Sequence, residues 1–224
     1  MGRQLDDLMD DAQSPGPSEV DDSALGLRER KKRRTRAAIV ASAMDLFEQR
    51  GFEDVRVAEI ARRADVSEAT VFNYFRTKED LVYSGLDDFW SRVLRAVAAR
   101  PVGVTVLDAF RSFLLGQPPA ADTSEQQQRL VAVSRMIVGS PTLRARERQA
   151  YDEGVEALAQ VIAQDRIPSP EDRVIAYALV GVHRVIVDDT RVQILAGAYG
   201  SMLAARTAAV ATRAFAALEA GLPS

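Results

Sequence analysis

Cysteine is absent from the 224-residue chain, and histidine occurs once, as His183. Without cysteine the chain has no disulfide framework, no thiolate metal site and no cysteine nucleophile. A lone histidine on a mostly apolar segment is more often a hydrogen-bonded core or pocket residue than a catalyst or a metal ligand. We therefore expect no metal and no cofactor. The lack of cysteine also fits a reducing compartment such as the cytoplasm.

Long apolar runs and an export signal are missing too. The most apolar late stretch, residues 174–195, is interrupted by four charged residues, which argues against a membrane span. The first residues are acidic and polar, where a secretory signal would carry basic and then apolar residues. We expect a cytoplasmic protein with no membrane partner.

Net charge is small, but the charge is segregated along the chain. Residues 1–27 hold one basic and seven acidic residues, residues 28–80 hold thirteen basic and ten acidic ones, and residues 81–224 hold fifteen of each. A basic block between an acidic tail and a neutral remainder is the distribution that a nucleic-acid partner requires.

The hydrophobic pattern predicts helices from residue 27 onward. Residues 1–27 contain Ser14-Pro15-Gly16-Pro17-Ser18 and few large apolar residues, so we expect a disordered acidic tail. Helical spacing then runs to Gly51, and two short helices follow at about 57–64 and 68–75, separated by three residues. Two short helices joined in this way are typical of a helix-turn-helix.

The rest of the chain also has helical spacing. Thr77 followed by acidic residues predicts the N-cap of a long fourth helix that ends before Pro101. Further helices are expected at 104–116, 124–138, 141–165, 170–196 and 199–220. The β-branched runs 102–106 and 185–187 are ambiguous by periodicity alone, and we assign them to helices.

The fold class is therefore all-α with about nine helices, in two folded parts after the tail. Residues 28–80 are expected to form a three-helix DNA-binding domain with the helix-turn-helix. Residues 81–224 are expected to form a helical domain for ligand binding and dimerisation.

The third helix can be divided into a buried and an open side by angle. At about 100° per residue, Val71 and Phe75 lie about 40° apart and form the buried pair. The opposite direction falls on Asn73 and close to Ala69. The residues beside this open side are Thr70, Phe72 and Tyr74.

The residue types on the open side suit a DNA groove. Asn73 can bond the N6/N7 edge of adenine, hydroxyls can reach phosphate, and Phe72 offers apolar contact to a thymine methyl group. Small Ala69 allows a close approach of the helix backbone. Glu68 favours the helix dipole but repels phosphate unless it accepts from a cytosine amino group, and both roles stay open.

Seven basic residues occur among the nine from Arg28 to Arg36, including Arg34 and Arg36. Such a run suits phosphate neutralisation, and a solvated helix face is the alternative. A helix-turn-helix about twenty residues later favours the phosphate interpretation.

Several elements in order and spacing resemble the N-terminal signature of the tetracycline-repressor (TetR) family over about residues 35–82. These elements are Gly51-Phe52, Val57-Ala58-Glu59-Ile60-Ala61, Ala64-Asp65-Val66-Ser67, Ala69-Thr70-Val71-Phe72-Asn73-Tyr74-Phe75 and Lys78-Glu79-Asp80-Leu81. The resemblance implies a dimer with one recognition helix per subunit, phosphate contact by Lys78, and an effector cavity beneath the fourth helix.

Three positions depart from the family pattern. Val55-Arg56 stands where threonines usually enter the second helix, so Arg56 is expected to supply a charged phosphate contact instead. Asp65 replaces the usual turn glycine, and aspartate tolerates left-handed geometry better than most residues. Phe72-Asn73-Tyr74 replaces the common Tyr-Tyr-His run, which changes the expected operator sequence.

The C-terminal part offers candidates for a pocket and for a dimer interface. Aromatic, thioether and imidazole side chains are the pocket candidates, with a plain core as the alternative: Phe89, Trp90, Phe110, Phe113, Met136, Tyr151 and His183. Apolar residues on more than one face of the last two helices suggest a four-helix dimer interface, with an intramolecular core as the alternative. The interface candidates are Val182, Ile186, Met202, Val210 and Phe215.

These features predict a sequence-specific DNA-binding transcriptional regulator. We expect a homodimer that acts as a repressor on a palindromic operator of double-stranded DNA and is released by a small-molecule effector. An activator, or a regulator without an effector, is the alternative. An enzyme is not expected, because nucleophile motifs, glycine-rich phosphate loops, histidine pairs and metal spacings are missing. A helical enzyme that uses only carboxylates and a protein-interaction module are the remaining alternatives.

Overall fold

In a computed structural model, residues 26–117, 123–164 and 166–221 are described, and within them the chain forms ten α-helices and no strand. The expected all-α class is confirmed. The predicted acidic tail, residues 1–27, lies outside the described residues except for Gly26 and Leu27. The helices are α1 (Leu27–Arg50), α2 (Val57–Arg63), α3 (Glu68–Tyr74), α4 (Glu79–Val82), α5 (Leu86–Ala98), α6 (Val106–Leu115), α7 (Ser124–Gly139), α8 (Pro141–Ala163), α9 (Pro170–Leu195) and α10 (Gly200–Ala220).

Local capping explains why most helices begin where the sequence predicts. The side chains of four hydroxyl residues each accept a hydrogen bond from a backbone N–H three residues later, which satisfies a free donor of the first turn. These caps are Thr105 before α6, Thr123 before α7, Ser140 before α8 and Ser169 before α9. Proline at the first position of α8 and α9 lacks the N–H that would be unpaired there.

The expected fourth helix from Thr77 to Ala99 is wrong as a single element, because the chain leaves the helix between Val82 and Leu86. The carbonyl of Tyr83 accepts from the N–H of Leu86 in a tighter turn, at 2.8 Å. The carbonyl of Ser84 accepts from Arg36 Nη2 at 2.5 Å instead of from the next turn. One local bond and one tertiary bond therefore replace the helical hydrogen bonds here, and they divide the segment into α4 and α5.

The assignment of the run 102–106 to a helix is also wrong for most of its length. Val102 to Thr105 form a turn and an extended link, with Gly103 at φ 88°, and α6 begins at Val106. The left-handed glycine and the cap at Thr105 end the irregular link. The second ambiguous run, 185–187, lies inside α9 as expected.

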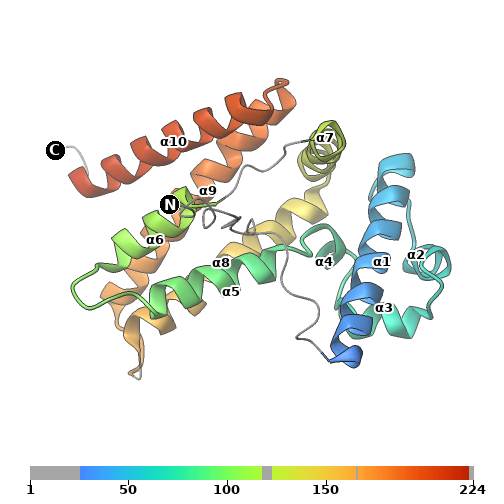
Figure 1. Cartoon of the computed structure of the whole chain (residues 1–224), viewed down its shortest axis with the longest axis horizontal. Helices are drawn as coiled ribbons and strands as arrows, with labels where there is room; N and C mark the ends of the chain where they lie inside the picture. The colour runs from blue at the N-terminus through green and yellow to red at the C-terminus, as the bar shows by residue number, and fades with distance from the viewer. Residues whose placement is uncertain (1–25, 118–122, 165, 222–224) are drawn as a thin grey trace, which may run out of the picture.

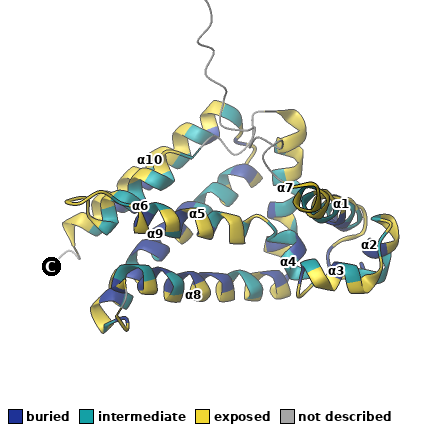
Figure 2. Ribbon diagram, turned by 60° about the horizontal axis from the view of Figure 1, so that its bottom comes forward, coloured by how far each residue is buried: buried dark blue, intermediate teal, exposed yellow. Residues whose placement is uncertain are grey.

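Two large hydrophobic cores hold the helices together, and a smaller cluster of Ile194, Ala198 and Leu203 packs against Leu130 and Val131 of α7. The first joins α1 to α4 and also takes Ile137 of α7 and Leu143 of α8, so the N-terminal helices are anchored on the rest of the chain. The second lies where α5, α6, α8, α9 and α10 meet. In Figure 1, α1 to α3 lie at one end of the molecule and α10 lies along the other. Figure 2 shows exposed and half-buried residues along most of α3 and α10.

Candidate nucleic-acid interface and internal cavity

The turn between α2 and α3 positions the third helix. Asp65 adopts φ 54°, the left-handed conformation that its sequence position predicted. Ser67 Oγ then accepts from the N–H of Thr70 at 3.0 Å and caps α3. Val71 and Phe75 are buried in the first core, as the angular analysis predicted.

The opposite side of α3 is open. Ala69, Phe72 and Asn73 are exposed, and Phe72 keeps half of its surface accessible. Tyr74 and Thr70 are half-buried at the edges, and the Thr70 hydroxyl lies 2.8 Å from that of Ser67. This side therefore presents an amide, an aromatic ring and a small residue together, and no other described residue is bonded to the side chain of Asn73 or Phe72.

The basic segment of α1 adjoins this helix. Arg34 is exposed, whereas the guanidinium of Arg36 lies 5.1 Å from the ring of Phe75 and bonds the carbonyl of Ser84. Arg36 thus joins α1 to the end of α3 and to the α4–α5 turn. Arg36 therefore packs beside the open side of α3, whereas the sequence predicted only a phosphate contact for it.

Lys78, for which the resemblance implied a phosphate contact, points to the loop between α1 and α2 in this structure. Its ammonium donates to the carbonyls of Phe52 and Val55 at 2.8 and 3.1 Å, approaches that of Glu53 at 3.4 Å, and lies 4.2 Å from the ring of Phe52. An ammonium has three N–H donors, and all three are directed at the α1–α2 loop. In this structure Lys78 stabilises that loop.

The two remaining interface candidates are exposed charges at helix starts. Arg56 precedes α2, and its backbone N–H donates to Glu59 Oε2 at 2.9 Å. The side chain of Arg56 is exposed at the surface. Glu59 also pairs with Arg50 at 2.5 Å, and this bond lowers the carboxyl pKa below its ordinary value. Glu68 is exposed in the first turn of α3, where a carboxylate favours the helix dipole.

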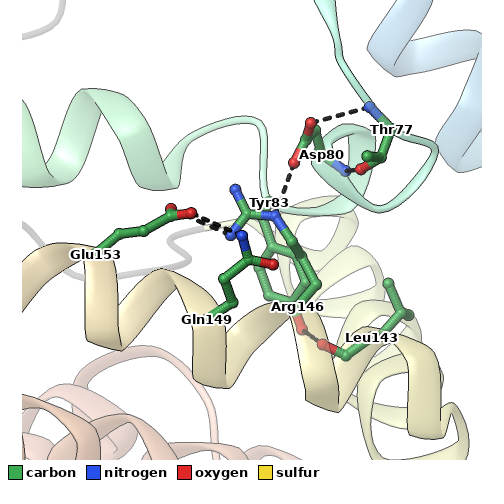
Figure 3. A network of polar contacts seen from close by, with 7 residues as sticks. All are labelled: Thr77, Asp80, Tyr83, Leu143, Arg146, Gln149 and Glu153. Carbon is green, nitrogen blue, oxygen red and sulfur yellow. Dashed lines mark hydrogen bonds and ion pairs between the residues drawn. The ribbon is translucent and has the colours of Figure 1, made fainter.

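A polar junction links α4 to α8 (Figure 3). Asp80 Oδ2 accepts from the N–H of Thr77 at 3.0 Å and its N–H donates to the Thr77 hydroxyl, so the predicted cap is present. The other carboxylate oxygen of Asp80 accepts from Arg146 Nε at 2.9 Å, and the side chains are each only 19% exposed. Tyr83 donates its hydroxyl to the carbonyl of Leu143 at 2.9 Å, and burial raises its pKa. These bonds hold α4, the helix that follows α3, on α8.

A partly open cavity of about 600 Å³ lies among α5, α6, α7, α9 and α10. One face of α9 and one face of α10 supply most of its wall, and the α10 residues are mostly small. The lining residues are Phe89, Leu114, Leu115, Gln117, Leu130, Val133, Ser134, Ile137, His183, Ile186, Val187, Thr190, Arg191, Ile194, Gly200, Leu203, Ala204, Thr207, Ala208 and Ala211.

Of the seven predicted pocket residues, the cavity brings together Phe89 and His183. Their rings stack at 4.7 Å, and Trp90, Phe113 and Tyr151 pack edge-on around them without lining the cavity. The other two lie elsewhere. Phe110 is fully buried against Phe215, and Met136 packs on the first core beside a shallow hollow between α1 and α7.

The pocket residues predicted from the sequence did not include the small residues of α10. Alanine counts as apolar in a helical pattern, so an alanine-rich helix suggests close helix packing rather than a cavity. Gly200, Ala204 and Ala208 instead face open space, because side chains of this size do not reach α7 and α9. Their spacing along one face of α10 was the available signal.

His183 is more than nine-tenths buried at one end of the cavity, and its Nδ1 atom makes no hydrogen bond within the described part of the chain. Burial lowers its pKa to about 4, so the ring is neutral at pH 7. Further along α9, Arg191 forms a two-pronged ion pair with Glu147, and both side chains are about one-seventh exposed. The hydroxyls of Thr190 and Thr207 lie 3.1 Å apart between these points.

Three of the five predicted interface residues lie inside the single chain. Val182, Ile186 and Phe215 are buried in the second core, so their side chains have partners before any second subunit binds. Val210 is half-buried against the same core, and Met202 is exposed on α10. For the three buried residues, the intramolecular alternative describes the structure.

No cluster of three or more His, Cys, Asp or Glu side chains suited to a metal is found within residues 26–117, 123–164 and 166–221. None of the helices in these ranges is long and apolar enough to cross a membrane.

Residues 39–83 match the family model of bacterial regulatory proteins of the tetR family. The chain is 31% identical over 161 residues to the HTH-type transcriptional regulator TcmR of Streptomyces glaucescens, covering 69% of this chain and 71% of that protein. It is 30% identical to the HTH-type transcriptional regulator RutR of Escherichia coli K12, over 53% of this chain and 55% of RutR. Native NalD, the secondary repressor of the MexAB-OprM multidrug efflux pump in Pseudomonas aeruginosa, has a similar fold, with a TM-score of 0.55, 19% identity and coverage of 82% and 96%.

Proposed function

The chain belongs to the tetR family of bacterial regulatory proteins, and from this premise we propose that it is a repressor released from a palindromic operator by a small molecule. Like the regulators of this family, it is a DNA-binding transcriptional regulator that acts as a dimer, and not an enzyme. As a regulator of bacterial genes it would act in the cytoplasm, where the chromosome lies.

The open side of α3 carries the proposal for DNA reading. Val71 and Phe75 anchor the helix, and this leaves Asn73, Ala69 and Phe72 exposed on the far side. The exposed amide of Asn73 can make the two bonds that distinguish adenine, and the aromatic ring beside it can contact a thymine methyl group. The exposed guanidinium groups of Arg34 and Arg56 supply charge for the phosphates on either side.

The proposed dimer interface is the exposed apolar stripe of α9 and α10. Val174, Val185 and Val192 on α9 are more than half exposed, and spacings of eleven and seven residues return them to nearly the same direction. Met202, Ala209 and Ala216 form a matching exposed line on α10. A second copy that covers these lines would make a four-helix contact and would set the distance between the two recognition helices.

The cavity supports the proposal of release by an effector. Phe89 of α5 lines the cavity. The turn at Tyr83 joins α5 to α4, and the bond between Asp80 and Arg146 holds α4 on α8. A ligand that displaces Phe89 would bias the position of α5, and through α4 that of α3. A coupling of about 1 to 3 kcal/mol between the two sites is typical and would suffice to change operator affinity 5- to 150-fold.

An electrophoretic shift with DNA from around the protein's own gene tests DNA reading. We expect a duplex that competes well against scrambled DNA at moderate salt. Asn73→Ala should cost about 1 to 3 kcal/mol at one base pair and relax the preference there, while Arg34→Ala should weaken all sequences alike. Binding that is no tighter than to scrambled DNA, or equal effects of both variants on sequence preference, would contradict the proposal.

A further inference from the structure

The shape of the cavity limits the ligand that it can hold. On α9 the lining residues run from His183 to Ile194, and on α10 from Gly200 to Ala211. Each stretch is about 16 Å long at the rise of about 1.5 Å per residue. Because the two helices line the space along the same length, the cavity is elongated and has room for a drug-sized molecule.

The charges of the wall limit the ligand further. Arg191 is the charged residue among the described lining residues, and its guanidinium is already paired with Glu147 on two oxygens. A ligand anion would have to break this buried pair, and a ligand cation would meet no carboxylate among the described lining residues. Either ion would lose its hydration without a partner, at a large cost.

One polar group in the wall lacks a partner. His183 is 7% exposed and lines the cavity, and its Nδ1 atom has no hydrogen-bond partner among the described residues. Phe89 stacks on it and orients the ring. A neutral imidazole has one donor and one acceptor nitrogen, so a hydroxyl group can bond it in either tautomer.

We propose that the effector is an uncharged, elongated and mainly apolar molecule that lies along α9 and α10 and carries a hydroxyl group bonded to His183. This inference rests on the proposed function, since it names the ligand class for the same cavity. His183 is then the residue that selects the hydroxylated molecule from its bare analogue, and the Arg191–Glu147 pair disfavours charged analogues.

Three rod-shaped probes of similar length test the proposal: trans-stilbene, trans-4-hydroxystilbene and trans-stilbene-4-carboxylate. Trp90 is the single tryptophan and its ring centroid lies 5.4 Å from that of His183, so quenching of its fluorescence reports binding to the full-length dimer without DNA. We expect 4-hydroxystilbene to bind about tenfold tighter than stilbene, and the carboxylate at least tenfold weaker than stilbene.

Variants separate the role of His183 from effects on folding. His183→Phe should bind stilbene and 4-hydroxystilbene equally, with stilbene affinity unchanged, and His183→Gln should keep part of the preference. Ala204→Phe should fill the cavity and abolish binding of all three probes. The proposal is overturned if the carboxylate binds most tightly, if no probe binds the wild type, or if His183→Phe keeps the full preference.

Operator release is measured separately with the same probes. If the probes bind in the expected order but leave the operator complex intact, the ligand class is supported and release by a ligand fails. If the order is reversed while bound probes still release DNA, the ligand class fails and the proposed function stands.

Discussion

The surroundings of His183 determine its protonation state in the folded chain. Burial among aromatic rings lowers its pKa from 6.5 to about 4. The folded chain keeps the ring neutral, whereas the unfolded chain takes up a proton below about pH 6.5. The unfolded state therefore binds more protons between about pH 6.5 and 4, and stability must fall as the pH falls through that range.

We expect His183 to remove about 1.4 kcal/mol of unfolding free energy per pH unit between pH 6 and 4.5. Urea unfolding at fixed protein concentration, compared with His183→Phe, measures this contribution as a difference of slopes. Carboxylates with lowered pKa, such as Asp172 beside Arg166, lose their contribution only at lower pH, and they cancel in the comparison. Parallel pH profiles for the two proteins would show that the imidazole is not held neutral.

Lys78 and Arg34 form a second comparison at the residue scale. Lys78→Ala removes three N–H donors from the α1–α2 loop, so we expect a loss of about 1 to 3 kcal/mol of stability. Arg34→Ala alters an exposed side chain and should leave the melting temperature unchanged. It should instead reduce the slope of log affinity against log salt by about 1, if Arg34 neutralises one phosphate. A lower salt slope with unchanged stability for Lys78→Ala would restore its phosphate role.

The open side of α3 could be predicted from the sequence, and the position of Lys78 could not. Burial within one helix follows from a fixed angle per residue, so Val71 and Phe75 identified the opposite side without any tertiary information. The acceptors of Lys78 lie 23 to 26 residues earlier in the chain. A side chain that bonds carbonyls so far away carries no local signal.

The positions at which the helices begin and break also have local causes in some cases and distant causes in others. The starts of α6 to α9 follow from a hydroxyl cap, so the sequence predicted them within about two residues. The break between α4 and α5 depends on Arg36 and on the contact of Tyr83 with α8, which no pattern within the segment contains. The spacing of the small residues on α10 was likewise not enough to place the cavity, because a void depends on what the facing helices fail to fill.

The contact of α5 with α8 yields a prediction at this scale. A methyl group added at Gly154 would lie 2.9 to 3.0 Å from the indole ring of Trp90, which is itself held by Phe89 and His183. We therefore expect Gly154→Ala to destabilise the protein by about 1 to 3 kcal/mol and to shift the Trp90 fluorescence. Gly139→Ala, at the end of α7 with no atom near the new methyl group, is the matched control and should be neutral or slightly stabilising. Equal stability of both variants would contradict the packing at Gly154.

At the scale of the whole molecule, DNA reading depends on how two copies are joined. The two cores connect the recognition helix to α9 and α10 within one chain, since the first core reaches α7 and α8 and the second reaches α10. A dimer contact at α9 and α10 would thus determine where both recognition helices lie. Val182, Ile186 and Phe215 of the second core are already buried in the single chain, so they offer little surface to a second copy.

The exposed stripe on α9 therefore makes the last prediction. Val185→Glu combined with Val192→Glu places two carboxylates where a second copy would cover exposed apolar residues, and buried unpaired charge is costly. We expect sedimentation of this variant to show a monomer at micromolar concentration, and its affinity for the palindromic operator to fall by about 100-fold or more. Val102→Glu, on a fully exposed turn between α5 and α6, is the control and should remain a dimer with unchanged affinity. A double variant that still sediments as a dimer would place the interface on another surface, and the distance between recognition helices would then be set elsewhere.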